Sequence, residues 1–156
     1  RRDLPAILSV GASYKVTDNY LVSTTGNFYF NRQAKMDRVK AFRGHQHGGD
    51  YKNGWEIALG NEYKLNEKFT LIGSMNYADT GAKTASFNDT EYALNSVTLG
   101  GGIRYQYDDS LSITASVAHF IYQGADGNFK EKYGVAENQK YKKEITALGL
   151  SITKKF

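Results

Sequence analysis

The sequence is defined first by what it lacks: its 156 residues contain no cysteine and a single proline. Without cysteine the chain can form no disulfide, no thiolate–metal site and no cysteine nucleophile. No stretch approaches the roughly 18 consecutive apolar residues of a transmembrane helix, so a membrane-spanning part would have to be a β-barrel. Lys and Arg number 20 against 16 Asp and Glu, and they are scattered, whereas nucleic-acid binding requires a clustered basic face. We therefore expect no nucleic-acid partner.

What the chain does contain is typical of a β-protein. It has 12 Tyr, 8 Phe, 1 Trp and 16 Gly, and apolar residues alternate with polar ones along its length, which is the two-residue period of strands. Its length is that of a single domain, residues 1–156. The alternation predicts an all-β fold, an antiparallel meander of about seven strands. The candidate strands are residues 6–16, 20–31, 51–65, 68–79, 96–107, 110–123 and 143–156.

The connections between these strands alternate strictly between short and long. The short ones consist of turn-forming residues, and the long ones are polar. They are residues 17–19, 66–67 and 108–109, against residues 32–50, 80–95 and 124–141. Transmembrane barrels have short periplasmic turns and longer external loops, so this alternation favours a membrane barrel over a soluble barrel of lipocalin type. The soluble barrel remains an alternative.

The two faces of the predicted strands differ in chemistry. One face carries aliphatic residues flanked by aromatic ones near the strand ends, and the other carries Ser, Thr, Gly and charged residues. Membrane interfaces select aromatic belts of this kind, whereas a soluble barrel would hold its apolar residues inside. The sequence therefore predicts a lipid-facing outer surface and a polar lumen. The predicted interface belt comprises Tyr14, Tyr20, Trp55, Tyr63, Phe69, Tyr77, Tyr105 and Tyr107.

The C-terminus resembles the assembly signal of bacterial outer-membrane barrels. Leu150, Ile152 and Phe156 share one face of the last strand, and the chain stops on the aromatic residue. Lys154 departs from that pattern, because an apolar residue is usual there. Bacterial single-chain barrels have even strand numbers, so seven strands leave two readings: an eighth strand within a long connection, or the C-terminal portion of a larger barrel. The start at Arg1 without a signal peptide favours the second.

Several segments resemble the FadL/TodX family of outer-membrane transporters. They are residues 3–14 (DLPAILSVGASY), 51–63 (YKNGWEIALGNEY), 69–73 (FTLIG) and 97–105 (VTLGGGIRY). The resemblance implies a 14-stranded barrel of which seven strands are the C-terminal half. It further implies a channel for long-chain fatty acids or aromatic hydrocarbons. Substrate would enter an extracellular hydrophobic groove, reach an internal pocket and leave sideways through the barrel wall.

That resemblance also implies where the protein lies and what it meets. We expect the outer membrane of a Gram-negative bacterium, with membrane lipid, lipopolysaccharide, a hydrophobic small-molecule substrate and the barrel-assembly machinery as partners. The full-length barrel would be monomeric. The family's plug and the kinked strand beside its lateral opening belong to the half not represented in this sequence, so this chain would supply only part of the pocket and loops.

Candidate ligand-binding residues lie on the polar face. A cation at Arg104, Lys64 or Lys15 could bind a fatty-acid carboxylate through a charge-assisted hydrogen bond. The alternative is that these cations pair with carboxylates of the same face, such as Glu56 and Glu62, or with charges elsewhere in a larger barrel. Four apolar exceptions on that face could line a lipid tail, although a misassigned register would explain them equally well. They are Ile7, Ile72, Phe120 and Tyr122.

Catalytic and metal chemistry find little support in the sequence. His45, His47 and Asp50 have a spacing that could bind a divalent metal, but solvated glycine-rich loops often carry such residues, so we predict no metal site. Gly100–Gly102 lies within a predicted strand, where glycine suits close packing rather than phosphate binding. His119 lies on the outward face near the interface. We therefore expect neither an enzyme nor a cofactor.

The sequence thus favours a passive outer-membrane channel for hydrophobic compounds. A small structural or adhesive outer-membrane barrel and a soluble lipocalin-like barrel remain as alternatives. Far-UV circular dichroism and heat-modifiable gel mobility, recorded in plain buffer and in detergent, separate them. We expect β-structure only with detergent, or folding in neither medium if the chain is an incomplete half. A cooperative monomeric fold in plain buffer would instead support the lipocalin-like barrel.

Overall fold

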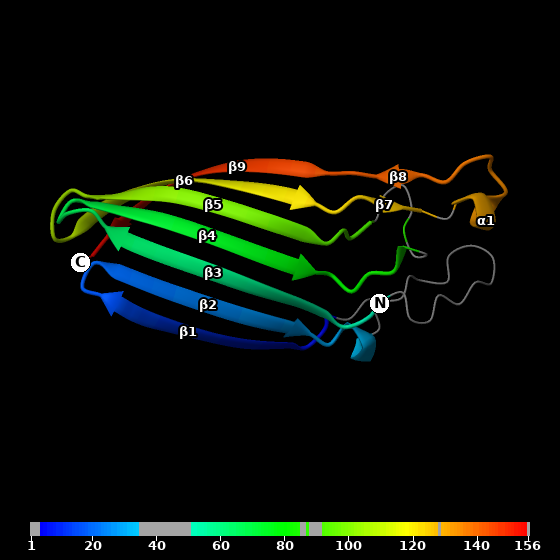
Figure 1. The fold of residues 1–156 in the computed structure, drawn as a ribbon, viewed down its shortest axis with the longest axis horizontal. Helices are drawn as coiled ribbons and strands as arrows, with labels where there is room; N and C mark the ends of the chain where they lie inside the picture. Colours follow the sequence, from blue (N-terminus) through cyan, green and yellow to red (C-terminus); the bar gives the residue numbers. More distant parts are fainter. Residues whose placement is uncertain (1–3, 35–50, 85–86, 88–91, 128, 156) are drawn as a thin grey trace.

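The computed structural model describes residues 4–34, 51–84, 87, 92–127 and 129–155. Seven long strands form one antiparallel sheet in the order β1-β2-β3-β4-β5-β6-β9, and they run side by side along the long axis of the molecule (Figure 1). The predicted all-β antiparallel meander is therefore confirmed. The strands are β1 (Ile7–Thr17), β2 (Tyr20–Tyr29), β3 (Gly54–Lys64), β4 (Phe69–Asp79), β5 (Ser96–Gln106), β6 (Leu111–Tyr122) and β9 (Glu144–Lys154).

The strands are long enough to cross a bilayer. Six contain 10 or 11 residues and β6 contains 12. A tilted transmembrane strand needs about 9–11 residues, so all seven meet this requirement. Among the described residues, no helix has the length and apolar character needed to span a membrane.

Two predicted boundaries are wrong, both at the end of the sheet that carries the long connections. The strand predicted for residues 20–31 stops at Tyr29, and a short 3-10 helix, η1 (Asn31–Gln33), follows it. The strand predicted from residue 51 starts at Gly54. Asn31 is the physical reason for both, because its buried side-chain amide donates to the carbonyl oxygens of Lys52 (3.1 Å) and Thr80 (3.0 Å). The sheet ladder is thus replaced locally by side-chain hydrogen bonds.

The long connection predicted at residues 124–141 contains local structure of its own. β7 (Ala125–Asp126) pairs with β8 (Lys140–Tyr141), and the short helix α1 (Phe129–Tyr133) lies between them. This ribbon extends beyond β6 and β9 (Figure 1) and forms a separate two-stranded sheet. Within the described ranges, therefore, no eighth strand joins the seven-stranded sheet.

The three tight turns form where predicted, and side chains fix two of them. The Asn66 side-chain oxygen accepts hydrogen bonds from the backbone amides of Lys68 and Phe69, both at 2.9 Å. The Asp108 carboxylate does the same for Ser110 (2.8 Å) and Leu111 (2.9 Å). The hydrogen bond from the Ser110 backbone amide, supported by the Ser110 hydroxyl, holds the pKa of Asp108 below its usual value. Such turns are the reason that consecutive strands pair directly.

All six strand pairings keep apolar side chains in phase on one face of the sheet, which we call the outer face. Leu59, for example, lies opposite Met75, and Met75 opposite Leu99. These three side chains are 46–49% exposed, although large apolar residues of a soluble protein pack into a core. The opposite, inner face of β3 is less exposed than its outer face, as the concave side of a curved sheet would be. The predicted separation of an apolar outer face from a polar inner face is thus present.

The buried hydrophobic cluster lies beyond the strands rather than between sheets. Phe87, Leu94, Phe129 and Tyr141 are 4–9% exposed and pack together, with the ring of Phe87 in edge contact with Tyr141 at 5.4 Å. Their aromatic burial stabilises the β7–β8 ribbon against the segment that precedes β5. The described part of the sheet has no comparable cluster on its inner face.

Three consecutive glycines in β5 face different surroundings. A Cβ on Gly102 would lie 2.9 Å from the carbonyl oxygen of Ala115 and 3.2 Å from the Ser116 Cβ, whereas a Cβ on Gly101 would meet nothing closer than 4.0 Å. Gly100 and Gly102 lie on the inner face and Gly101 on the outer face. Close approach of β6 therefore requires glycine at position 102 but not at position 101.

We expect Gly102→Ala to destabilise the protein by about 1–3 kcal/mol, because the added methyl group overpacks against backbone. Gly101→Ala is the matched control, and we expect its effect to stay within about 1 kcal/mol because the same methyl group has room and reduces unfolded-chain entropy. Guanidinium unfolding of the protein in detergent measures both. Equal losses in the two variants would show that close packing of β5 on β6 does not set the glycine requirement.

Candidate functional site: the inner wall of the sheet

The inner wall is formed by the alternate residues of seven strands that point away from the apolar outer face. Most are small or polar, such as Ser74, Thr98 and Ser116. Among the described residues, five charged side chains stand on this wall. They are Lys15, Glu56, Glu62, Lys64 and Arg104. The wall can therefore offer hydrogen bonds and charge to a molecule that contacts it, but few apolar contacts.

Arg104 forms the strongest interaction of the wall. Its guanidinium donates two hydrogen bonds to the Glu62 carboxylate, at 3.0 and 3.1 Å, so the pair is bidentate and charge-assisted. Arg104 lies on β5 and Glu62 on β3, and β4 lies between these strands. Both side chains are about one-third exposed. The sequence allowed Arg104 either to bind a ligand carboxylate or to pair with a carboxylate of the same face. In the structure it pairs with Glu62.

Glu56 occupies the other end of the wall, toward the long connections. Its carboxylate accepts hydrogen bonds from the Asn27 side-chain amide (3.0 Å) and from the Tyr29 hydroxyl (3.1 Å). Both donors lie on β2, and Asn27 is the register partner of Glu56. This cluster was not predicted, although the shared face of Asn27 and Glu56 was visible in the alternation. Together the groups form a polar site that can accept a hydrogen bond or a positive charge.

Lys15 and Lys64 lie at the tight-turn end of the wall. The Lys15 ammonium is 3.0 Å from the Asp18 carboxylate, and both side chains are largely exposed, so the contact contributes little. Lys64 has no ion-pair partner within the described residues. Together with Glu62 and the first turn, the two lysines line a pocket of about 210 Å³. We call this the rim pocket, and among the described inner-face residues its Lys64 is a cation for which no ion pair forms.

The apolar exceptions do lie on the inner face, so a misassigned register does not explain them. Ile72 is opposite Glu62 and Gly102, and Phe120 is opposite Thr98 and Ile145. Tyr122 is opposite Ser96, and the Lys143 ammonium lies 4.4 Å from its ring centre. Phe120 and Tyr122 are neighbours at the long-connection end, whereas Ile72 lies toward the tight turns. Ile7 is opposite Tyr29 on β1, at the far edge of the sheet, so the structure brings together two of the four apolar exceptions.

The predicted interface belt forms aromatic pairs on the outer face at both ends of the strands. Tyr20 contacts Tyr63 and Phe69 contacts Tyr105 near the tight turns, at centroid distances of 6.2 and 5.1 Å. Trp55 contacts Tyr77 near the long connections, at 5.2 Å. Tyr14 and Tyr107 are more exposed, at 72% and 64%. Leu150 and Ile152 lie on the outer face of β9, and Phe156 lies outside the described residues.

The sequence placed His119 on the outer face and raised a possible metal site at His45, His47 and Asp50. His119 lies on the outer face opposite Leu99, and its Nδ1 is 2.9 Å from the Thr146 hydroxyl, so it is tied to β9. His45, His47 and Asp50 lie outside the described residues. Elsewhere in the described chain, no three His, Cys, Asp or Glu side chains come together as a metal site.

Comparison with known proteins identifies the fold. No family model and no curated protein matches the sequence. The structure superposes on the crystal structure of a Pseudomonas aeruginosa FadL homologue with a TM-score of 0.76, over 96% of this chain, at 18% sequence identity. This chain has the fold of a FadL barrel segment. It spans 35% of the length of that chain, so it corresponds to part of a FadL-like barrel.

Because Arg104 and Glu62 neutralise each other within the FadL-like wall, each single substitution leaves an uncompensated charge. We expect Arg104→Gln and Glu62→Gln each to destabilise the protein by about 1–2 kcal/mol, and the double variant to cost less than their sum. Partial solvent exposure of the pair keeps the coupling energy near about 1 kcal/mol. Chemical unfolding of the four proteins in detergent gives this cycle. Strictly additive effects would show that the bidentate contact does not stabilise the wall.

Proposed function

We propose that this chain forms part of the wall of an outer-membrane channel that passes long-chain fatty acids or other hydrophobic compounds by passive diffusion. One observation carries the proposal: seven bilayer-length strands with an apolar exposed outer face and a polar inner face superpose on a FadL homologue over 96% of the chain. An exposed band of Ile, Leu and Met suits contact with lipid. It argues against the soluble lipocalin-like alternative, whose apolar residues would point inward.

Strand directions support a larger barrel. In an antiparallel sheet of seven strands, the first and last strands, β1 and β9, run in the same direction. If they paired with each other they would form a parallel pair. Closure with antiparallel pairs alone therefore requires an odd number of further strands between them, and seven more would give the 14 strands of a FadL-type barrel. Such a closed barrel would need no second copy, consistent with a monomer that the barrel-assembly machinery inserts.

In this proposal, hydrophobic compounds enter at the long-connection end. A pocket of about 370 Å³ lies beside the β7–β8 ribbon, and the aromatic side chains of Tyr122 and Tyr141 line it together with the charged Asp126, Lys140 and Lys142. Phe120 and Tyr122 extend the aromatic surface of this pocket onto the inner wall, whereas the wall nearer the tight turns carries the Arg104–Glu62 pair. In this proposal, a hydrophobic compound contacts the aromatic end first and then meets a wall on which it binds weakly. Weak binding permits release and hence diffusion.

We test the function with the protein expressed from its complete gene and reconstituted in liposomes. Entry of oleate and of toluene should follow the concentration gradient without an energy source. Phe120→Asp should slow entry several-fold, because it places a carboxylate on the apolar surface, and Phe120→Leu should retain most of the flux. Stopped-flow fluorescence measures oleate entry through acidification of the vesicle interior. Flux no greater than that of protein-free liposomes would contradict the proposal.

A further inference from the structure

Glu56 is a negative charge of the inner wall with which no described cation forms an ion pair. Its two carboxylate oxygens accept hydrogen bonds from the Asn27 side-chain amide (3.0 Å) and the Tyr29 hydroxyl (3.1 Å), and both contacts are partly buried. Because these donors are neutral, they orient the carboxylate without cancelling its charge. Glu56 therefore presents a fixed negative charge on the inner face of β3, near the long connections.

The wall around Glu56 is uncharged over three levels, where a level is a set of inner-face register partners that crosses the sheet. At the level of Glu56, and at the next two levels toward the tight turns, every other described residue is neutral. The three levels comprise Ser9, Asn27, Ala78, Ser96 and Tyr122; then Gly11, Thr25, Ala58, Asn76, Thr98, Phe120 and Ile145; then Ser13, Ser23, Gly60, Ser74, Gly100, Ala118 and Ala147. Among the described residues of these levels, Glu56 is thus the one charge.

The remaining charges of the inner wall are too distant to offset that of Glu56. Along β3, Glu62 lies six residues away and Lys64 lies eight residues away, which is about 20 and 26 Å of extended strand. Charges farther apart than about 10 Å are largely screened at 0.1 M salt. Arg104 is at the same distant end of the wall and is paired with Glu62. None of these groups therefore removes the negative potential near Glu56.

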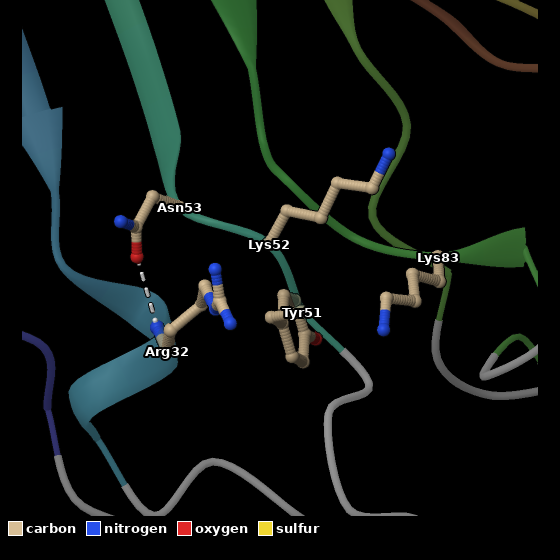
Figure 2. Close-up of a pocket in the computed structure, with 5 residues that line it drawn as sticks. All are labelled: Arg32, Tyr51, Lys52, Asn53 and Lys83. Atoms are coloured by element: carbon tan, nitrogen blue, oxygen red, sulfur yellow. Dashed lines mark hydrogen bonds between the residues drawn. The ribbon is translucent and has the colours of Figure 1, made fainter.

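The described cations nearest to this end of the wall lie beyond the strands and are exposed. Three of them line a pocket of about 590 Å³ (Figure 2), namely Arg32, Lys52 and Lys83. Lys52 precedes Glu56 by four residues, which is about 13 Å of extended chain, and its side chain extends away from Arg32 (Figure 2). The Lys143 ammonium lies 4.4 Å from the ring centre of Tyr122 on β6, three strand spacings or about 14 Å from β3. Water and salt screen these exposed cations more than they screen part-buried Glu56.

We propose that Glu56 determines specificity in the channel by favouring cationic and uncharged hydrophobic compounds over anionic ones. The inference rests on the proposed function and deepens it, because it concerns which compounds pass along the wall. The carboxylate would attract a cation and repel an anion, whereas an uncharged compound would experience neither effect. The apolar part of each compound would meet the same neighbouring residues, Phe120 and Tyr122. The charge of the head group therefore decides which of two otherwise equal compounds passes faster.

Two analogues with the same apolar part and fixed opposite charges test the proposal: phenylbutyltrimethylammonium and phenylbutanesulfonate. The protein expressed from its complete gene is reconstituted in liposomes of zwitterionic lipid, with valinomycin and equal potassium on both sides to hold the membrane potential at zero. At about 10 mM salt, a unit charge about 7 Å from the carboxylate is enriched or depleted about twofold. We therefore expect protein-dependent entry of the cation to be about fourfold faster than that of the anion. At about 1 M salt the screening length falls to about 3 Å, so the preference should vanish.

Substitution of Glu56 separates its charge from any structural role. Glu56→Gln should slow the cation and speed the anion, each about twofold, whereas a damaged channel would change both rates in the same direction. Glu56→Asp keeps the charge and should keep most of the preference. The charge-matched control is Glu67→Gln, at an exposed residue of the second tight turn, and its ratio of rates should stay within about 1.5-fold of the unaltered protein because of its distance from Glu56. Heat-modifiable gel mobility checks that each variant is folded.

The outcomes distinguish failure of this inference from failure of the channel function. Entry of the anion at least as fast as that of the cation through the unaltered protein would overturn the inference and leave the channel standing. An unchanged ratio of rates in Glu56→Gln would do the same, as would an equal change in Glu67→Gln. If oleate and both analogues enter no faster than into protein-free liposomes, the proposed transport itself is wrong and the inference fails with it. As expected support, oleate entry should rise about twofold in Glu56→Gln at low salt.

Discussion

Every functional feature of this sheet depends on six strand pairings that stay in phase. Successive side chains of a strand point to opposite faces, so a slip of one residue in any pairing would move a whole strand's apolar set to the polar side. The registers avoid this from β1 to β9, and they align Leu59, Met75 and Leu99 across three neighbouring strands. The same phase brings Arg104 within reach of Glu62 across β4. The apolar exterior and the polar wall are therefore two consequences of one constraint.

Much of this arrangement could be predicted from the sequence because its signals are local. Alternation along each strand and turn formers such as Asn66 and Asp108 determine where strands run and where they reverse. Because side chains alternate between the two faces of a strand, the positions of Ile72 and Phe120 assign them to the inner face, and the strand registers confirm that assignment. The fold class followed from these signals, whereas the FadL-like topology was implied by the resemblance of segments such as residues 97–105 to that family. They needed no knowledge of contacts between distant residues.

The parts that could not be predicted depend on distant contacts. Asn31 ends β2 early because its side chain donates to the carbonyl oxygen of Thr80, 49 positions away in the chain. No local sequence pattern predicts that hydrogen bond. The β7–β8 ribbon exists because Tyr141 packs with Phe87 and Phe129, which lie in separate polar connections. For the candidate site, the sequence identified Arg104 and Glu62 as charges of one face. Whether Arg104 pairs with Glu62 or is available to a ligand could be decided only from the distance between the two side chains across β4.

The distribution of charge along the inner wall limits which chemical groups this wall could bind. A buried or half-buried cation attracts a carboxylate strongly only while it lacks another partner. Arg104 has Glu62, and the remaining inner-face cations, Lys15 and Lys64, lie at the tight-turn rim, while Glu56 presents negative charge near the long connections. In the proposed channel, a fatty-acid carboxylate would therefore be repelled near Glu56, and among the described inner-face residues it would meet an unpaired cation, Lys64, at the far rim. Along most of its described length, this wall would contribute weak, non-ionic contacts to the proposed channel, and such contacts favour passage of the hydrophobic part of a compound over tight retention of its head group.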